Sequence, residues 1–121
     1  MLTRILLLVA FQIGVAEASA ADLTAADIAQ IKIICRALSR AEGAPSKSDA
    51  ILKRLSPYVR DTRTLSEVHE ICADRCSVLV ALRDNADIYF SYPDDPNARI
   101  DTVVFHHRGK TIFSIGSDGK R

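Results

Sequence analysis

The amino-acid sequence predicts an α+β domain in which two or three N-terminal helices pack on one face of a three- to four-stranded antiparallel sheet. Three observations support this fold class. After residue 20, apolar residues recur at helical spacing through the first half of the chain, and the alternation typical of strands replaces that spacing after Cys76. Three cysteines in a chain of 121 residues indicate one disulfide. Residues 21–121 are therefore expected to form a single small domain.

The first helix is predicted to begin near Thr24. Thr24 and Asp27 resemble a capping box, in which each side chain accepts a hydrogen bond from the other residue's backbone amide. The helix is expected to end before Gly43 and Pro45, because glycine favours a left-handed cap and proline cannot continue a helix. The apolar residues at core-facing spacing are Ile28, Ile31, Ile34, Cys35 and Leu38.

A second side of this helix is also apolar. It carries Ala26, Ala29, Ile33 and Ala37, which is unusual for a helix surface that faces water. This Ile33 face is expected either to be buried between the sheet and a neighbouring helix or to contact another chain, which would allow a homo-oligomer.

Two further helices are predicted before the sheet. One lies between Ser46 and Pro57, since the residue before a proline is pushed out of helical geometry. The other occupies residues 65–76 and begins with a capping box formed by Thr64 and Glu67. The alternative for this segment is a strand over residues 66–72 that turns at Ala73, Asp74 and Arg75. The helical interpretation rests on the spacing of Leu65, Val68, Ile71, Cys72 and Cys76.

The sheet is predicted to follow Cys76. Residues 78–82 are a continuous apolar run, which is typical of a strand covered on both faces. Asp84 and Asn85 then favour a turn. Residues 87–92 alternate between apolar and polar side chains, and this alternation places Tyr89 on the outer face of the sheet.

The last hairpin is predicted over residues 100–115. A three-residue loop at residues 108–110 would place His107 opposite Thr111. This register buries the most apolar surface, because it gathers the large side chains on one face. That face carries Val103, Phe105, Phe113 and Ile115, and the other carries Val104, His106, Ile112 and Ser114.

Residues 1–20 are predicted to be a cleavable signal peptide. Arg4 precedes an apolar run at residues 5–11 that is too short to span a membrane, and Ala18 to Ala20 have the small side chains that signal peptidase accepts. The mature domain is therefore expected in the periplasm or outside the cell, without membrane attachment. A net charge of +1 with no basic block argues against nucleic acid as a partner.

Cys35, Cys72 and Cys76 remain after cleavage of the leader. One pair of these is expected to form a disulfide in an oxidising compartment, which leaves one thiol over. Pairing Cys35 with Cys72 or Cys76 would close a loop of about 40 residues and stabilise the domain by roughly 3 to 4 kcal/mol. The spacing does not decide which two cysteines pair.

His69, Cys72 and Cys76 carry an alternative interpretation of the function. If residues 65–76 are helical, the three side chains lie on one face and together could hold a soft metal or form a thiol site. A metal handler or redox partner in the periplasm would follow from this arrangement.

His106 and His107 carry a second alternative. Adjacent strand residues point to opposite faces, so at most one of them faces any site. Paired with Asp87, Asp101 or Ser114 on a neighbouring strand, one histidine could act as the base of a small hydrolase or isomerase. No catalytic motif or cofactor-binding pattern accompanies them, and no cofactor is expected.

The remaining features favour a binding domain that recognises another protein. Tyr89 is predicted to face outward next to an acidic loop that contains Asp94 and Asp95, followed by Arg99. An exposed aromatic ring beside charged residues is typical of the centre and rim of a protein contact. The sequence therefore predicts a small exported, non-catalytic domain of the inhibitor or immunity-protein kind.

Overall fold

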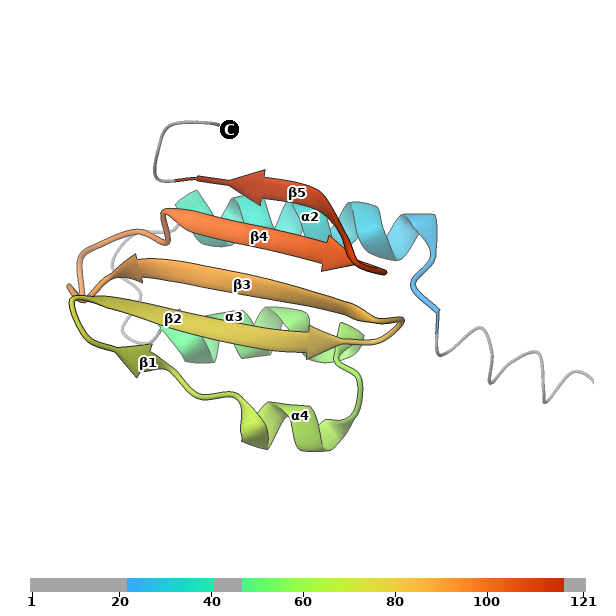
Figure 1. Ribbon diagram of the computed structural model, residues 1–121, viewed down its shortest axis with the longest axis horizontal. Helices are drawn as coiled ribbons and strands as arrows, with labels where there is room; N and C mark the ends of the chain where they lie inside the picture. Colours follow the sequence, from blue (N-terminus) through green and yellow to red (C-terminus); the bar gives the residue numbers. More distant parts are fainter. Residues whose placement is uncertain (1–21, 41–46, 117–121) are drawn as a thin grey trace, which may run out of the picture.

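A computed structural model describes residues 22–40 and 47–116 of the chain (Figure 1). Three α-helices and one 3-10 turn come first, and five strands follow. The helical elements are α2 (Ala25–Arg40), α3 (Lys47–Leu55), the 3-10 turn η1 (Ser56–Tyr58) and α4 (Thr62–Glu67). The strands are β1 (Ile71–Cys72), β2 (Arg75–Leu82), β3 (Ala86–Pro93), β4 (Thr102–His107) and β5 (Lys110–Ile115).

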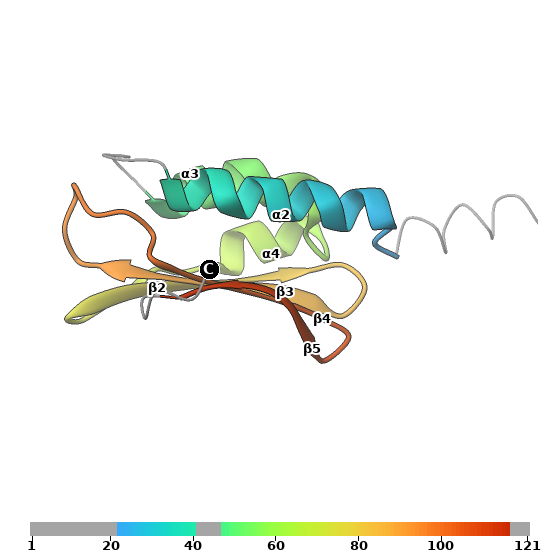
Figure 2. The same cartoon turned by 90° about the horizontal axis from the view of Figure 1, so that it is seen from above.

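The strands form one antiparallel meander in the order β1-β2-β3-β4-β5. Helices α2 and α3 lie side by side on one face of this sheet (Figure 2). The predicted α+β class is confirmed, with five strands in place of the expected three or four. The core between the two layers contains the fully buried residues Ile31, Cys35, Ile51, Leu55, Val78, Val80, Leu82, Ile88, Phe90, Val103 and Phe105.

Helix α2 begins as the sequence predicts. The backbone amide of Thr24 donates to the Asp27 carboxylate at 3.0 Å, and the amide of Asp27 donates to the Thr24 hydroxyl at 3.0 Å. The Ile33 face is not buried between helix and sheet, because Ile33 is 55% exposed. Contact with another chain remains the prediction for this face. The predicted end of the helix at Gly43 to Pro45 lies outside the described residues.

Helix α4 begins earlier than predicted and is short. Its N-cap is Asp61, whose carboxylate accepts a hydrogen bond from the Thr64 amide at 3.0 Å. This hydrogen bond lowers the pKa of Asp61. The capping box expected from Thr64 and Glu67 is therefore wrong, because an aspartate three residues earlier is a stronger N-cap than threonine. Glu67 is the last residue of the helix.

The helix predicted over residues 65–76 is also wrong. Val68 leaves helical geometry at φ −77° and ψ 127°, and residues 71–82 form the β1-β2 hairpin instead. Cys72 and Cys76 lie directly opposite each other in this hairpin and are joined by a disulfide, with a Cα–Cα distance of 4.0 Å. The expected disulfide thus closes a five-residue turn, and Cys35 is buried and free.

Strand β2 is covered on one face only. Its burial alternates from residue to residue, so that Val78 and Val80 face the helices while Leu79 is 57% exposed. The expectation that this apolar run is covered on both faces is therefore wrong. The predicted turn after it is confirmed, because Asp84 and Asn85 both take positive φ angles, 61° and 53°.

The β4-β5 hairpin buries the predicted face through a different turn. Its loop has two residues, Arg108 and Gly109, both at positive φ, so His107 lies opposite Lys110 and not Thr111. A bulge at Ile112 then takes up the extra residue and restores the register. Phe105 consequently opposes Phe113, and Val103 opposes Ile115, as the apolar pattern requires.

The turn residue Asp84 joins the chain before α2 to both hairpins. Its carboxylate accepts hydrogen bonds from the Leu23 amide at 3.0 Å, from His107 Nε2 at 2.8 Å and from the Arg108 guanidinium at 3.0 Å. These donors, led by His107, lower the pKa of Asp84 to about 2. Leu23 is itself buried at 6% exposure, so the cluster fixes where the chain enters the core.

The predicted leader, residues 1–20, lies outside the described residues. Among the helices that the structure describes, none has the length and apolar character needed to cross a membrane.

Candidate functional site

Among residues 22–40 and 47–116, no element covers the face of the sheet opposite the helices, and this face turns apolar side chains outward. The strand register places Leu79, Tyr89 and Val104 in one row across β2, β3 and β4, with Ser114 of β5 at its end. The next row begins at Ile71 of β1, which lies opposite Ser77. We call Ile71, Leu79, Tyr89 and Val104 the sheet-face patch.

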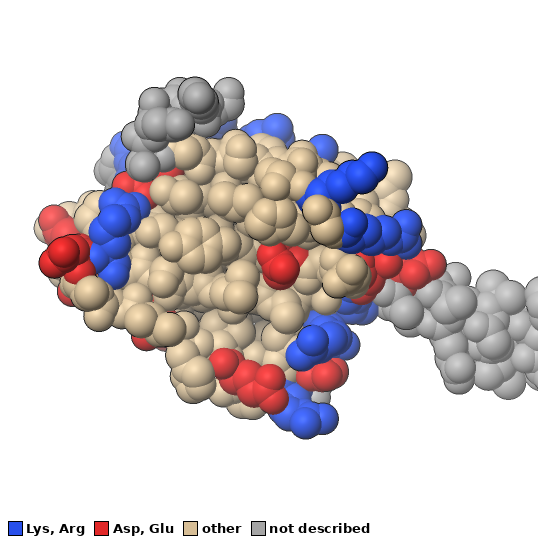
Figure 3. All heavy atoms as spheres, viewed as in Figure 1, with Lys and Arg blue, Asp and Glu red and all other residues tan. Residues whose placement is uncertain are grey.

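Three members of the sheet-face patch are exposed to an unusual degree for their side chains, and the fourth, Val104, is half-buried. Ile71 is 69% exposed, Leu79 is 57% exposed and Tyr89 is 37% exposed. In the space-filling view of this face, mostly uncharged atoms fill the centre, with one acidic group among them, and most Lys and Arg atoms lie toward the periphery (Figure 3). Adjacent exposed apolar side chains mark a contact surface, whereas scattered ones do not.

A shallow groove borders the patch along α4. Its floor contains Leu79 and Ala81, its wall contains Val68, and Arg60 and Glu67 also line it, with a volume of about 130 Å³. Val68 also packs against the core. The groove therefore extends the apolar surface from the sheet onto the segment that leads into β1.

One charged pair lies on the same face. His106 Nδ1 is 3.1 Å from the Asp87 carboxylate, and the two residues are cross-strand partners. Their side chains are 40% and 44% exposed. The expected pairing of His106 with Asp87 is thus present, while His107 points to the helix side and binds Asp84. Among the described residues, no hydroxyl nucleophile has a hydrogen bond to His106.

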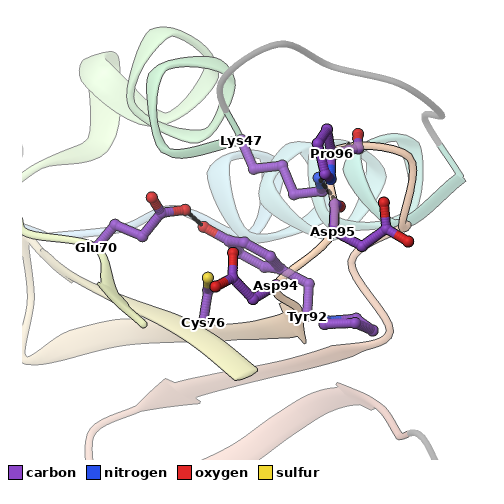
Figure 4. A pocket seen from close by; sticks show the side chains of 8 residues that line it. Lys47, Glu70, Cys76, Tyr92, Asp94, Asp95 and Pro96 are labelled. Carbon is purple, nitrogen blue, oxygen red and sulfur yellow. Dashed lines mark hydrogen bonds between the residues drawn. The ribbon is translucent and has the colours of Figure 1, made fainter. Parts of the chain in front are cut away.

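The residues predicted for a binding site do not all come together. Tyr89 faces outward as the alternation predicts, in the middle of β3. Asp94 and Asp95 lie beyond the end of that strand and line a pocket of about 200 Å³ on the helix side, with Lys47 and Tyr92 (Figure 4). Tyr89 does not line it. Arg99 is exposed in the same loop and has a bonding partner.

Several polar groups of this pocket are bound to one another. The Lys47 ammonium donates to the carbonyl oxygens of Asp95 at 3.3 Å and Pro96 at 3.5 Å, and it lies 5.3 Å from the centre of the Tyr92 ring. The Tyr92 hydroxyl donates to the Glu70 carboxylate (Figure 4). Burial, followed by this bond, raises the pKa of Tyr92. The pocket therefore holds the loop after β3 against the start of α3.

Cysteine sulfurs and a carboxylate lie beside this pocket. Ligand atoms of Glu70, Cys72 and Cys76 are within 4.8 Å of one another, and His69, the histidine predicted to join them, is not in the group. Both sulfurs are in the disulfide, so neither is the thiolate that a soft metal requires. Cys35 is not in this group, and burial raises the pKa of its free thiol to about 12.

The sequence identified Tyr89 as a surface residue but missed Ile71 and Leu79. Both were assigned to buried stripes, Ile71 of a helix and Leu79 of a doubly covered strand. No local signal separates them from their buried neighbours, because cover on one face depends on where the helices pack. Only the strand register shows that Leu79, Tyr89 and Val104 are cross-strand partners in one row.

Comparison with protein-family models, with curated proteins and with solved structures finds no match.

Proposed function

We propose that this chain is an exported, non-catalytic domain that recognises another protein through the sheet-face patch, in the manner of an inhibitor or an immunity protein. The observation that carries the proposal is the exposure of Leu79 and Tyr89 in one cross-strand row. Removing a leucine and a tyrosine from water on one rigid surface supplies the central contact that protein interfaces need.

The scaffold supports recognition because the patch is held by regular structure. Leu79, Tyr89 and Val104 belong to three neighbouring strands, and their inward-facing neighbours are in the core. The backbone of a preorganised sheet loses little conformational freedom on binding, which lowers the entropic cost of association. In the pocket beside Tyr92, by contrast, the Lys47 ammonium and the Tyr92 hydroxyl are already bonded to other groups of the pocket.

Export is the second part of the proposal. Residues 1–20 have the pattern of a secretory leader, and the Cys72–Cys76 disulfide is a bond that persists in an oxidising compartment. A domain in the periplasm or outside the cell meets other exported proteins, which is where an inhibitor or immunity protein acts.

The test is capture of a partner from the periplasm or culture medium of the producing cells. The mature domain carrying Leu79→Glu should lose a partner that the wild type retains, because a carboxylate would have to be buried at the contact. Lys53→Gln is the matched control, since Lys53 is exposed on α3 and its replacement changes the net charge by the same amount. Equal capture by the wild type and Leu79→Glu would contradict the proposal.

The His106–Asp87 pair supports a second candidate function. A carboxylate at 3.1 Å orients the imidazole, as general-base catalysis by a small hydrolase or isomerase requires. Activity that is lost in both His106→Ala and Asp87→Ala, with retained folding, would favour catalysis on the same face. Activity unchanged in His106→Ala would remove this candidate.

A further inference from the structure

Strand β5 is an open edge of the sheet. Within residues 22–40 and 47–116 it pairs with β4 on one side and with no strand on the other. An edge strand of six residues therefore presents backbone N–H and C=O groups to an incoming chain. The opposite edge is different, because β1 has only two residues and is tied to β2 by the disulfide.

A groove runs between this edge and helix α2, which lies above β5 in Figure 2. It has a volume of about 280 Å³ and is lined by Arg36, Ser39 and Arg40 of α2 and by Phe113, Ser114 and Ile115 of β5. Phe113 is half-buried, and the Arg36 guanidinium lies 5.0 Å from the centre of its ring. The groove thus combines an apolar floor with a cationic wall.

The wall of the groove is positively charged. Arg36 and Arg40 are exposed and four residues apart on α2, so they lie on the same side of the helix as Lys32. Among the described residues that line the groove, none is acidic. Lys110, also exposed, adds a positive charge at the start of β5. Among the described residues, a segment that enters this groove therefore meets two guanidinium groups and no carboxylate.

We infer that the β5 edge binds an extended segment of another protein that carries acidic side chains on one face. The segment adds a sixth strand to the sheet by backbone hydrogen bonds to β5, and its carboxylates point toward Arg36 and Arg40. Recognition of this kind obtains affinity from the main chain and specificity from alternate side chains. Arginine is suited to it because its guanidinium binds a carboxylate with two parallel hydrogen bonds.

This inference rests on the proposed function and names the partner segment that the domain selects. Ser114 of β5 is in the same row as Val104, so an added strand extends the uncovered face next to the sheet-face patch. One partner can thus lie over Tyr89 and insert an acidic strand beside β5.

A second copy of the chain fits the groove less well. Pairing two β5 edges antiparallel would bring the Arg36 and Arg40 side chains of both copies toward one interface. Like charges that approach each other oppose association, so charge complementarity favours an acidic segment over self-pairing.

The test uses a synthetic extended peptide as the probe. A fluorescent acetylated peptide of four Val-Glu repeats places every carboxylate on one face, and binding to the mature domain is followed by fluorescence anisotropy. We expect saturable binding that weakens with added salt, while the corresponding Val-Lys peptide does not bind. Absence of saturable binding of the Val-Glu peptide at millimolar concentration would overturn the inference.

Two N-methylated peptides separate strand addition from simple charge attraction. One is methylated at every valine amide and the other at every glutamate amide. Only one alternate set of amides points to β5, so one peptide should lose about a hundredfold in affinity, since each of three lost hydrogen bonds contributes about a factor of five. The other peptide should bind nearly as well as the parent. Equal affinity of the two would overturn the inference.

Protein variants provide the matched comparison. Arg36→Glu with Arg40→Glu should weaken binding of the Val-Glu peptide about tenfold or more and create binding of the Val-Lys peptide, which the wild type lacks. The control reverses the exposed Lys53 and Arg54 on α3, which keeps the same net charge change away from the groove. Equal loss in the two double variants would overturn the inference.

The two proposals fail separately. Leu79→Glu leaves the β5 edge intact, so it should abolish capture of the partner and leave binding of the Val-Glu peptide unchanged. If the peptide does not bind while capture still depends on Leu79, the inference about β5 is wrong and the proposed function stands.

Discussion

Reduction of the Cys72–Cys76 disulfide should cost the domain about 2 kcal/mol of unfolding free energy. The two cysteines are four residues apart, and closing so short a loop removes only about 2 kcal/mol of chain entropy from the unfolded state. A bond from Cys35 to either partner would close about 40 residues and contribute roughly 4 kcal/mol in the same treatment. The size of the loss therefore reports which cysteines are joined.

The assay is urea unfolding of the mature domain with and without dithiothreitol. For a domain of this size the urea m-value is about 1 kcal/mol per molar, so the midpoint should fall by roughly 2 M on reduction. Cys35→Ala should keep the full response to the reductant, and Cys72→Ala with Cys76→Ala should have none. A Cys35→Ala variant that no longer responds to dithiothreitol would refute the pairing.

Three further predictions concern the core and the turn. Because Cys35 is buried and burial raises the pKa of its thiol to about 12, no thiol should react with Ellman's reagent in the native protein and one should react after unfolding; a thiol that reacts in the native protein would contradict this. Phe90→Ala should cost about 3 to 5 kcal/mol because Phe90 is fully buried, whereas Leu79→Ala should cost less than about 1 kcal/mol, as urea unfolding would measure. The pKa of Asp84 falls from 3.8 to about 2 on folding, so its stabilisation is complete above pH 3.8 and is lost as the pH falls toward 2; Asp84→Asn should lack this part of the acid dependence.

Local sequence signals predicted helix α2 and the register of the last strands. The capping box of Thr24 and Asp27 satisfies backbone amides within one helical turn, so its outcome depends on neighbours in the sequence. The prediction that Val103 and Phe105 align with Ile115 and Phe113 is confirmed, although the predicted loop length was wrong. The bulge at Ile112 compensates for the shorter loop and keeps the alignment that buries most surface. The apolar pattern therefore predicted the strand alignment correctly even though the turn was predicted wrongly.

The helix prediction for residues 65–76 was wrong because the apolar pattern of this segment is ambiguous without long-range contacts. Val68, Ile71 and Cys72 keep a helical spacing, yet their geometry is decided by strand pairing. Ile71 pairs with Ser77, and strand β2 in turn pairs with all of β3. Interactions between distant residues override local propensity in such a case.

The candidate site was predictable only in part. Alternation along β3 identified Tyr89 as outward-facing, but the acidic residues Asp94 and Asp95 were expected beside it and instead line a pocket on the helix side. Leu79 was expected to be buried, because a continuous apolar run carries no mark of which face the helices leave open. The uncovered face is a property of the tertiary structure.

Site-specific photo-crosslinking in the producing cells tests most directly whether the sheet-face patch is where this domain meets a partner. A photoreactive benzophenone side chain at position 79, in the exposed row with Tyr89, should form one discrete covalent adduct with an exported protein, and the same group at position 53 should form none. An adduct from position 53 with none from position 79 would contradict the account.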